Sequence, residues 1–227
     1  DYIGQTEWNR NVGRLWSRAM DELSRRLFDG EMRVQYVAVA EWQARGALHM
    51  HAILRLPQNI DVGSYADRDR RSQRSRVMEE SVRSVSVRGG TGERYAWGEQ
   101  VVAEMIGDGR GMRRTAGYLA KLVQYSVKDL SGEMQTRYEH SAERSAHQRE
   151  LSTVAEVTQC TRRGCGTKAV GECRGMAHRQ WGFRGHCVRK SREWSMVTLG
   201  SLRAKRQRWH DGESPCGDDA HEWIYVG

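Results

Sequence analysis

The fold prediction rests on one stretch of the sequence, Glu41-Trp42-Gln43-Ala44-Arg45-Gly46-Ala47-Leu48-His49-Met50-His51-Ala52-Ile53-Leu54-Arg55. Side chains alternate between the two faces of a strand, so His49 and His51 share one face while Leu48 and Met50 lie on the other. Two imidazoles on one face can hold one metal ion, and a carboxylate from the preceding strand could complete the site.

The sequence on either side of Gly46 predicts two strands, over residues 32–41 and 47–56. The connection is short enough for a hairpin. If position 41 pairs with position 49, Glu41 lies beside both histidines; a shift of one residue would send it to the other face. The third metal ligand therefore depends on the register.

Helical periodicity predicts an amphipathic helix over residues 6–29, with Thr6 as its N-cap and Gly30 just after its end. The same reasoning predicts helices over 70–85, 112–130 and 141–158, a strand over 94–106, a turn at Gly89, Gly90 and Gly92, and a flexible linker at Gly107, Gly109 and Gly111.

The helix predicted over 112–130 carries Tyr118 and Lys121 one turn apart, and the spacing recurs at Tyr125 and Lys128. A tyrosine hydroxyl beside a bound metal could attack a phosphodiester and become linked to DNA, with a 3′-hydroxyl leaving. Because a phenol titrates near about 10, Lys121 could stabilise the phenolate or hold the phosphate. The alternative is that both tyrosines pack in the core with their hydroxyls at the surface.

Composition narrows the class of protein. The chain has 227 residues, which suggests one domain or one domain with an appendage. Its formal net charge of +8 suggests a polyanionic partner, either nucleic acid or anionic lipid. No apolar run is long enough to span a membrane. The 5 cysteines are an odd number and no signal peptide is evident, which predicts a reducing, cytoplasmic environment.

The last third of the chain is rich in cysteine and basic residues. Cys160, Cys165 and Cys173 could form a structural zinc site with Cys187, His178 or His186. The gaps of four and seven residues are looser than in a Cys-x-x-Cys knuckle, so buried reduced thiols are the simpler alternative. Arginine and lysine at 184, 189, 190, 192, 203, 205, 206 and 208 suit phosphate contacts, or a solvated helix face.

Several segments together carry a resemblance to a known family. They are Trp8-Asn9-Arg10, Val34-Gln35-Tyr36, the stretch from Glu41 to Ala52, Tyr95-Ala96-Trp97-Gly98-Glu99-Gln100, Ala116-Gly117-Tyr118-Leu119-Ala120-Lys121 and Trp181-Gly182-Phe183-Arg184-Gly185-His186. With them the sequence resembles the HUH (histidine, hydrophobic, histidine) endonucleases. It resembles more closely the replication initiators of actinobacterial, Streptomyces-type, rolling-circle and conjugative plasmids.

The resemblance implies an α+β fold, with a central antiparallel sheet that carries the histidine pair on a central strand and is flanked by helices. It implies that His49, His51 and Glu41 bind Mg²⁺ or Mn²⁺, that Tyr118 is the nucleophile with Lys121 as its partner, and that Tyr125 is a candidate second nucleophile. The substrate would be single-stranded DNA at a replication origin. The enzyme would nick it through a 5′-phosphotyrosine to start rolling-circle replication, with host helicase and polymerase as partners.

The predicted DNA contacts are Arg45, Arg113, Arg114, Arg184, Lys190 and Arg192. The expected organisation is a catalytic domain over 1–158, a basic extension over 159–210 packed on it, and an acidic tail over 211–227. The family's first strand has no counterpart here, so we expect the chain to begin inside the domain.

Two other functions compete with the initiator. A transposase or conjugative relaxase would use the same chemistry, and a non-catalytic DNA- or RNA-binding module would keep the histidines as structural residues. Relatives also run two Tyr-x-x-Lys units directly together, whereas Leu122-Val123-Gln124 separates them here.

Overall fold

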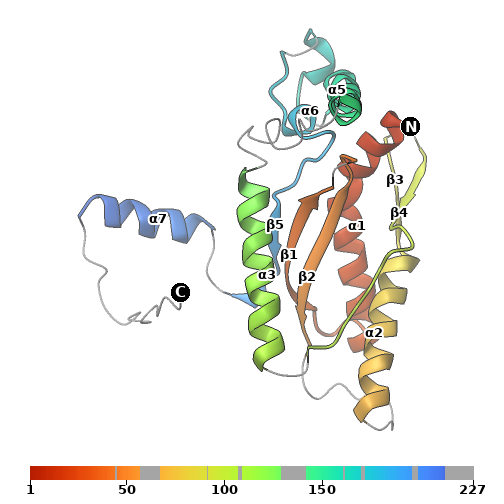
Figure 1. Cartoon of the computed structure of the whole chain (residues 1–227), viewed down its shortest axis with the longest axis vertical. Helices are drawn as coiled ribbons and strands as arrows, with labels where there is room; N and C mark the ends of the chain where they lie inside the picture. The colour runs from red at the N-terminus through yellow and green to blue at the C-terminus, as the bar shows by residue number, and fades with distance from the viewer. Residues whose placement is uncertain are drawn as a thin grey trace. The chain divides into compact units, whose positions relative to one another are not determined.

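The computed structural model describes residues 1–43, 45–56, 67–90, 92–106, 109–128, 142–160, 162–169, 172–195 and 199–212. It has the predicted α+β class, with a three-stranded antiparallel sheet and helices packed on it (Figure 1). The chain separates into two compact units, Asp1–Ser191 and Arg192–Gly227. None of the helices in the described part of the chain is both long and apolar enough to cross a membrane.

Helix α1, Tyr2–Phe28, begins earlier than predicted. The side chain of Asp1 caps it by accepting a hydrogen bond from the backbone N–H of Gly4 at 2.8 Å. The prediction of Thr6 as the N-cap is wrong, because Thr6 lies fully buried inside the helix. Gly30, with φ of 83°, follows the end of the helix as predicted.

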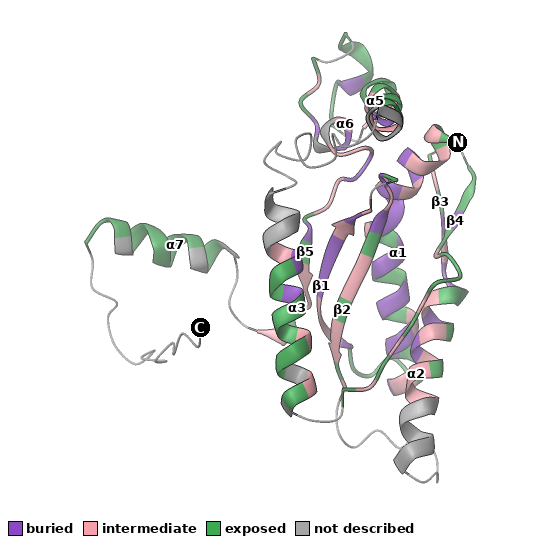
Figure 2. Ribbon diagram, viewed as in Figure 1, coloured by how far each residue is buried: buried purple, intermediate pink, exposed green. Residues whose placement is uncertain are grey.

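The apolar stripe of α1 packs against one face of the sheet, and Figure 2 shows both buried and exposed residues along this helix. Leu15 and Leu23 are completely buried. Helix α2, Asp67–Ser84, lies beside α1 and contributes Met78 to the same core cluster as Leu23. Burying one leucine side chain stabilises the fold by about 1.5–3 kcal/mol. Leu23 packs in one cluster with Met78 of α2 and Ala38 of β1, so its burial helps to hold α1 against both elements.

The predicted hairpin is present as β1, Gln35–Trp42, and β2, Leu48–Arg55. Glu41 pairs with His49, which confirms the register needed to bring the carboxylate beside the histidines. The sheet order is β2-β1-β5, so β1 is central and β2 is an edge strand of the described sheet. The expected placement of the histidines on a central strand is therefore not what the described strands show.

The third strand, β5, Val188–Lys190, comes from the last third of the chain. Within it Arg189 pairs with Ala38 of β1. The pairing continues on both sides, because the Ala40 N–H donates to the Cys187 carbonyl at 2.7 Å and the Ser191 N–H donates to a carbonyl of β1 at 2.9 Å. The segment after residue 158 thus returns to the sheet.

A second hairpin, β3 Ser86–Arg88 and β4 Arg94–Ala96, packs on α1, and its turn contains the predicted glycines. The prediction of one strand over 94–106 is wrong, because the strand ends at Ala96. Backbone groups of residues 97–106 bond instead to the side chains of Arg83 and Glu79 on α2. These two backbone groups therefore bond to side chains of α2 and not to the backbone of a neighbouring strand.

The remaining elements are α3 Gly109–Lys128, α5 Ala142–Val157, the 3₁₀ turn η2 Cys165–Thr167, α6 Met176–Arg179, the 3₁₀ turn η3 Arg192–Trp194 and α7 Leu199–His210. Because α3 begins at Gly109, the predicted linker is wrong for Gly109 and Gly111, which are helical. Gly107 lies outside the described residues.

Helix α3 covers the face of the sheet opposite α1 (Figure 1). Leu119 and Leu122 are buried against Val39 of β1. The residues of α1 contact a different set of β1 side chains, including Ala38 and Ala40. The sheet therefore separates an α1 face from an α3 face.

Candidate metal and nucleophile site

The α3 face of the hairpin carries the two histidines and the carboxylate. Val39 pairs with His51 and Glu41 pairs with His49, and directly opposed residues in an antiparallel pair share a face. Val39 is in contact with α3, so His49, His51 and Glu41 all lie on the side that α3 covers. Alternation in the sequence predicted that the two histidines share a face, and the observed register meets the condition on which the place of Glu41 depended.

The three side chains converge closely. The Nε2 atom of His51 lies 2.8 Å from Oε2 of Glu41, and the rings of His49 and His51 have centroids 4.8 Å apart. One ligand atom from each of the three residues lies within 4.8 Å of the others. Neighbouring ligands of an octahedral Mg²⁺ ion are about 3 Å apart, so the set can close on one ion by small rotations.

The lowered pKa of His49 favours metal binding. Burial lowers the pKa of His49, and the charge of His51 lowers it further, while Glu41 partly offsets both effects. A lowered pKa keeps the imidazole neutral at neutral pH, and only a neutral imidazole can ligate a metal.

Gln43 also contributes to the histidine site, and the sequence interpretation did not identify it. Its side-chain amide lies 3.3 Å from Nδ1 of His49, and the Arg45 guanidinium donates to Gln43 Oε1 at 2.9 Å. Gln43 thereby restrains the ring orientation of His49. The signal that could have found it is its position two residues after Glu41, which puts it on the same face of the strand.

Tyr118 reaches this site from α3. Its ring centroid lies 5.6 Å from that of His51, with the rings nearly perpendicular at 78°. The side chain is 49% exposed, whereas the next residue, Leu119, is buried against the sheet. The helix is anchored through its apolar stripe, and Tyr118 stands at the edge of that stripe, beside the histidines and open to solvent.

Two further residues of α3, Lys121 and Tyr125, were predicted to act with Tyr118. Lys121 is exposed and lies one turn from Tyr118 on the same side of the helix. Tyr125 is within α3, but its side chain lies outside the described residues, so its role as a second nucleophile stays a prediction.

Asn9 on α1 holds the turn that leads into β2. Its Nδ2 atom donates to the carbonyls of Gly46 and Trp181, each at 2.9 Å, and its Oδ1 accepts from the Leu48 N–H at 3.3 Å. Asn9 is completely buried, so these bonds satisfy polar groups that water cannot reach. The residue before His49 is therefore fixed from the opposite face of the sheet.

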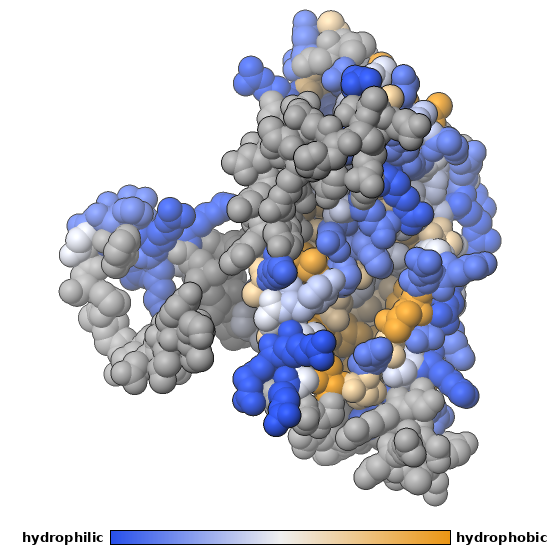
Figure 3. Space-filling model, in the orientation of Figure 1, coloured by the Kyte–Doolittle hydropathy of each residue, from blue (hydrophilic) through white to orange (hydrophobic). Residues whose placement is uncertain are grey.

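The predicted DNA contacts lie in three places. Arg45, Arg113 and Arg114 are exposed at the hairpin turn and near the start of α3. The view in Figure 3 shows hydrophilic surface around hydrophobic patches in its middle. Lys190 pairs with Val37, which places it on the α3 face. The other two, Arg184 and Arg192, do not join this group: Arg184 lies on the α1 face, and Arg192 is exposed in the second compact unit.

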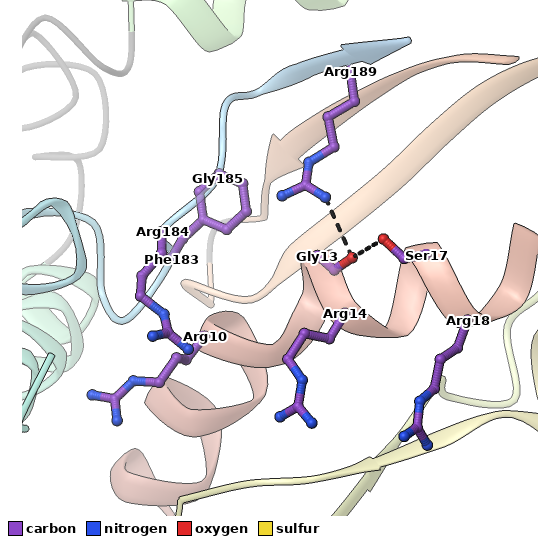
Figure 4. A pocket seen from close by; sticks show the side chains of 9 residues that line it. All are labelled: Arg10, Gly13, Arg14, Ser17, Arg18, Phe183, Arg184, Gly185 and Arg189. Carbon is purple, nitrogen blue, oxygen red and sulfur yellow. Dashed lines mark hydrogen bonds between the residues drawn. The ribbon is translucent and has the colours of Figure 1, made fainter. Parts of the chain in front are cut away.

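Arg184 belongs to a hollow on the α1 face that the sequence did not predict. It has a volume of about 550 Å³ and is lined by five arginines, Arg10, Arg14, Arg18, Arg184 and Arg189 (Figure 4). Burial, followed by the charge of Arg10, lowers the pKa of Arg184. Crowded guanidinium groups favour an anion, and phosphate suits their planar donors.

The hollow and the histidine site lie on opposite faces of the sheet. The Arg189 guanidinium donates to the Gly13 carbonyl on α1 at 3.3 Å, and Arg189 pairs with Ala38, whose side chain packs in the cluster with α1. A phosphate held there would not be the one that Tyr118 reaches.

The cysteines predicted as possible zinc ligands also come together. Cys160, Cys165 and Cys173 lie around His178, whereas Cys187 is buried elsewhere, in the cluster with Trp42, and His186 is exposed.

Comparisons with known proteins agree on one family. The family model described as "Replication initiator protein, pSAM2" (RepSA) matches residues 1–226. A replication initiator protein of Streptomyces ambofaciens is 31% identical over 245 residues, an alignment that covers 91% of this chain and 49% of the relative. The chain thus spans about half the length of that curated relative. No solved structure matches it.

Proposed function

Because the chain belongs to the RepSA family of replication initiator proteins, we propose that it initiates rolling-circle replication by nicking single-stranded origin DNA through Tyr118. Transposases and relaxases can use the same chemistry, but the family match favours replication. The resemblance of the His-x-His stretch to HUH endonucleases supports the nicking mechanism.

One observation carries the proposal. The ring of Tyr118 lies against His51, at a centroid separation of 5.6 Å, and His51 contacts Glu41 at 2.8 Å. These residues come from three elements, β1, β2 and α3, and packing of α3 on the sheet brings the tyrosine to the carboxylate and imidazole. A tyrosine that served only the core would not stand 49% exposed at a set of metal ligands.

The proposed reaction conserves the energy of the phosphodiester bond, because one P–O bond replaces another. The Oη atom of Tyr118 attacks phosphorus, an Oη–P bond forms, and the P–O3′ bond breaks. The phenolic proton passes to solvent, and the departing 3′-oxygen takes a proton from solvent. The product is a 5′-phosphotyrosine and a free 3′-hydroxyl, and the reverse attack by that hydroxyl rejoins the strand.

Chain residues prepare this step. Glu41, His49 and His51 would hold Mg²⁺ or Mn²⁺, and a divalent cation bound there supplies Lewis-acid polarisation of a phosphodiester oxygen. Gln43 orients the ring of His49. Lys121, one turn from Tyr118, would stabilise the negative charge of the phenolate.

Basic residues on both faces would hold the DNA. Arg45, Arg113 and Arg114 lie exposed on the side of Tyr118 and would bind phosphates next to the scissile one. The arginine-lined hollow on the α1 face would bind the backbone of DNA that continues past the site.

The test is a covalent adduct on a denaturing gel. The purified chain is incubated with Mn²⁺ and single-stranded oligonucleotides that are tiled across the origin of its replicon and labelled at the 3′ end. We expect one oligonucleotide to give a protein-sized labelled band, because the 5′-phosphate of the 3′ fragment stays on the tyrosine. Tyr118→Phe should remove the band, since it deletes only the attacking oxygen.

The matched control is Tyr125→Phe, the same change seven residues along the same helix. It should leave the adduct in place. An adduct that survives Tyr118→Phe and disappears in Tyr125→Phe would contradict the nucleophile, and one that forms unchanged in excess chelator would contradict the metal. A label that shifts only when placed at the 5′ end would contradict the polarity.

A further inference from the structure

A second group of side chains that could hold a metal ion lies beyond the end of α5. Cys160, Cys165, Cys173 and His178 each offer one ligand atom, and these four atoms all lie within 4.8 Å of one another. They come from the segment after α5, the turn η2, the segment before α6, and α6 itself. None of them takes part in the proposed DNA chemistry.

The distances fit a tetrahedral zinc ion. The sulfur atoms of Cys160 and Cys173 are 3.8 Å apart, and Sγ of Cys165 lies 3.2 Å from Nε2 of His178. With a Zn–S bond of about 2.3 Å, two thiolates on one tetrahedral zinc lie about 3.8 Å apart. A disulfide would bring the sulfurs to about 2 Å, so these cysteines are not paired as disulfides.

Surrounding hydrogen bonds prepare the ligands. Nδ1 of His178 donates to the Ala155 carbonyl at 2.7 Å, which leaves the lone pair of Nε2 directed at the cluster. The backbone N–H groups of Cys160 and Arg162 donate to the sulfurs of Cys165 and Cys160, each at 3.4 Å.

The backbone passes too close to the sulfurs for any side chain. A Cβ at Gly175 would lie 2.8 Å from Sγ of Cys160 and 3.6 Å from Sγ of Cys173. Glycine therefore lets the chain close around the cluster between the third cysteine and the histidine.

Few buried side chains stabilise the segment that carries these four residues. Between residues 160 and 178, the buried residues among those described are Cys165, Gly175 and Ala177. So small a buried set cannot order a loop of this length, and small segments of this kind are stabilised by metals or disulfides.

We propose that Cys160, Cys165, Cys173 and His178 bind one structural Zn²⁺ ion. The ion ties the end of α5 to α6, and α6 leads directly into Trp181 and the strand β5. Three thiolates and one imidazole suit zinc, while the carboxylate and imidazoles of the other site suit Mg²⁺ or Mn²⁺. The two sites would therefore take different metals.

The test is the metal content of the purified chain. The chain, freed of any affinity tag, is expressed with zinc in the medium and measured by inductively coupled plasma mass spectrometry. We expect one zinc per chain, lost in Cys165→Ser and in His178→Ala. Substitution by Co²⁺ should give the strong visible absorption of a tetrahedral thiolate site.

Matched variants separate zinc binding from misfolding and from the DNA chemistry. His178→Cys should keep one zinc and shift the cobalt spectrum, because the ligands change from three sulfurs and a nitrogen to four sulfurs. Cys187→Ala, a cysteine outside the cluster, should keep the zinc. His49→Ala should abolish the DNA adduct yet keep the zinc, so failure of one proposal is distinguishable from failure of the other.

The proposal is overturned if the chain purifies without zinc, if mass spectrometry finds disulfides among the three cysteines, or if zinc is lost in His49→Ala and retained in Cys165→Ser.

Discussion

At the scale of single residues, Asn9 shows how a side chain far from the chemistry can define a site. It joins three segments: α1, the β1–β2 turn and the chain at Trp181. All three of its polar partners are backbone groups, and one of them belongs to the residue directly before His49. A side chain with both a donor and an acceptor is needed, and asparagine supplies both.

We predict that Asn9→Ala lowers the free energy of unfolding by about 3 kcal/mol or more, since each buried polar group left without a partner costs about 1–3 kcal/mol. The measurement is urea denaturation followed by tryptophan fluorescence. The control is Asn11→Ala, also buried but bonded only within α1, which should cost less. Equal costs for the two variants would contradict the bridging role.

A second variant, Asn9→Asp, tests whether the side chain at position 9 must donate hydrogen bonds. At neutral pH a carboxylate would face the carbonyls of Gly46 and Trp181, to which Asn9 now donates, so the variant should be at least as unstable as Asn9→Ala. Burial and these carbonyls raise the pKa of that carboxyl in the folded state above its unfolded value of about 3.9. Its deficit should therefore shrink as the pH falls through the raised pKa, and a deficit independent of pH would contradict the argument.

At the scale of elements, the hairpin and its site could be predicted from sequence because both depend on local rules. Alternation placed His49 and His51 together, and the short turn predicted the hairpin, but the pairing of Glu41 with His49 was one of two registers that the sequence left open. The position of α3 on this face depends on contacts between residues far apart in the sequence, and it was predicted only from the resemblance to the HUH endonucleases. The packing of Leu119 and Leu122 on Val39 is its physical basis.

Other features could not be predicted because the deciding partner is remote in sequence. The segment around Tyr95-Ala96-Trp97 suggested a strand that continues to Ile106, yet side chains of α2 bond to the backbone beyond Ala96. Thr6 resembles an N-cap, but Gly182, with φ of 95°, packs its backbone against it, where a Cβ would lie 2.1 Å from the Thr6 carbonyl oxygen. No local pattern reveals a contact across more than 170 residues.

We predict that Leu122→Ala slows adduct formation by loosening α3 on the sheet. Leu122 is 3% exposed, and truncation of a buried leucine costs about 2–5 kcal/mol. Single-turnover rates with a saturating oligonucleotide, measured well below the melting temperature, would report the placement of Tyr118. The control is Ala120→Ser, at an exposed position of the same helix, which should leave the rate unchanged. A destabilised Leu122→Ala with a normal rate would show that this packing does not position the tyrosine.

At the scale of the whole molecule, the described residues between 159 and 191 belong to the same compact unit as the hairpin. They supply β5 to the sheet, Phe183 to the core at 1% exposure, and the Trp181 carbonyl to Asn9. They also supply the proposed zinc ligands. The sequence suggested an extension packed on a catalytic domain, because a three-residue strand is too short to recognise in a pattern of alternation.

We therefore predict that a chain ending at residue 158 will not unfold cooperatively, whereas one ending at Ser191, the limit of the first compact unit, will. Removing 159–191 leaves one edge of β1 without its partner and opens the cluster around Trp42 to water. Thermal melting followed by circular dichroism, with zinc present in both samples, distinguishes the two. A sharp transition in the shorter chain, within a few degrees of the longer one, would mean that the hairpin, α1 and α3 form a domain of their own.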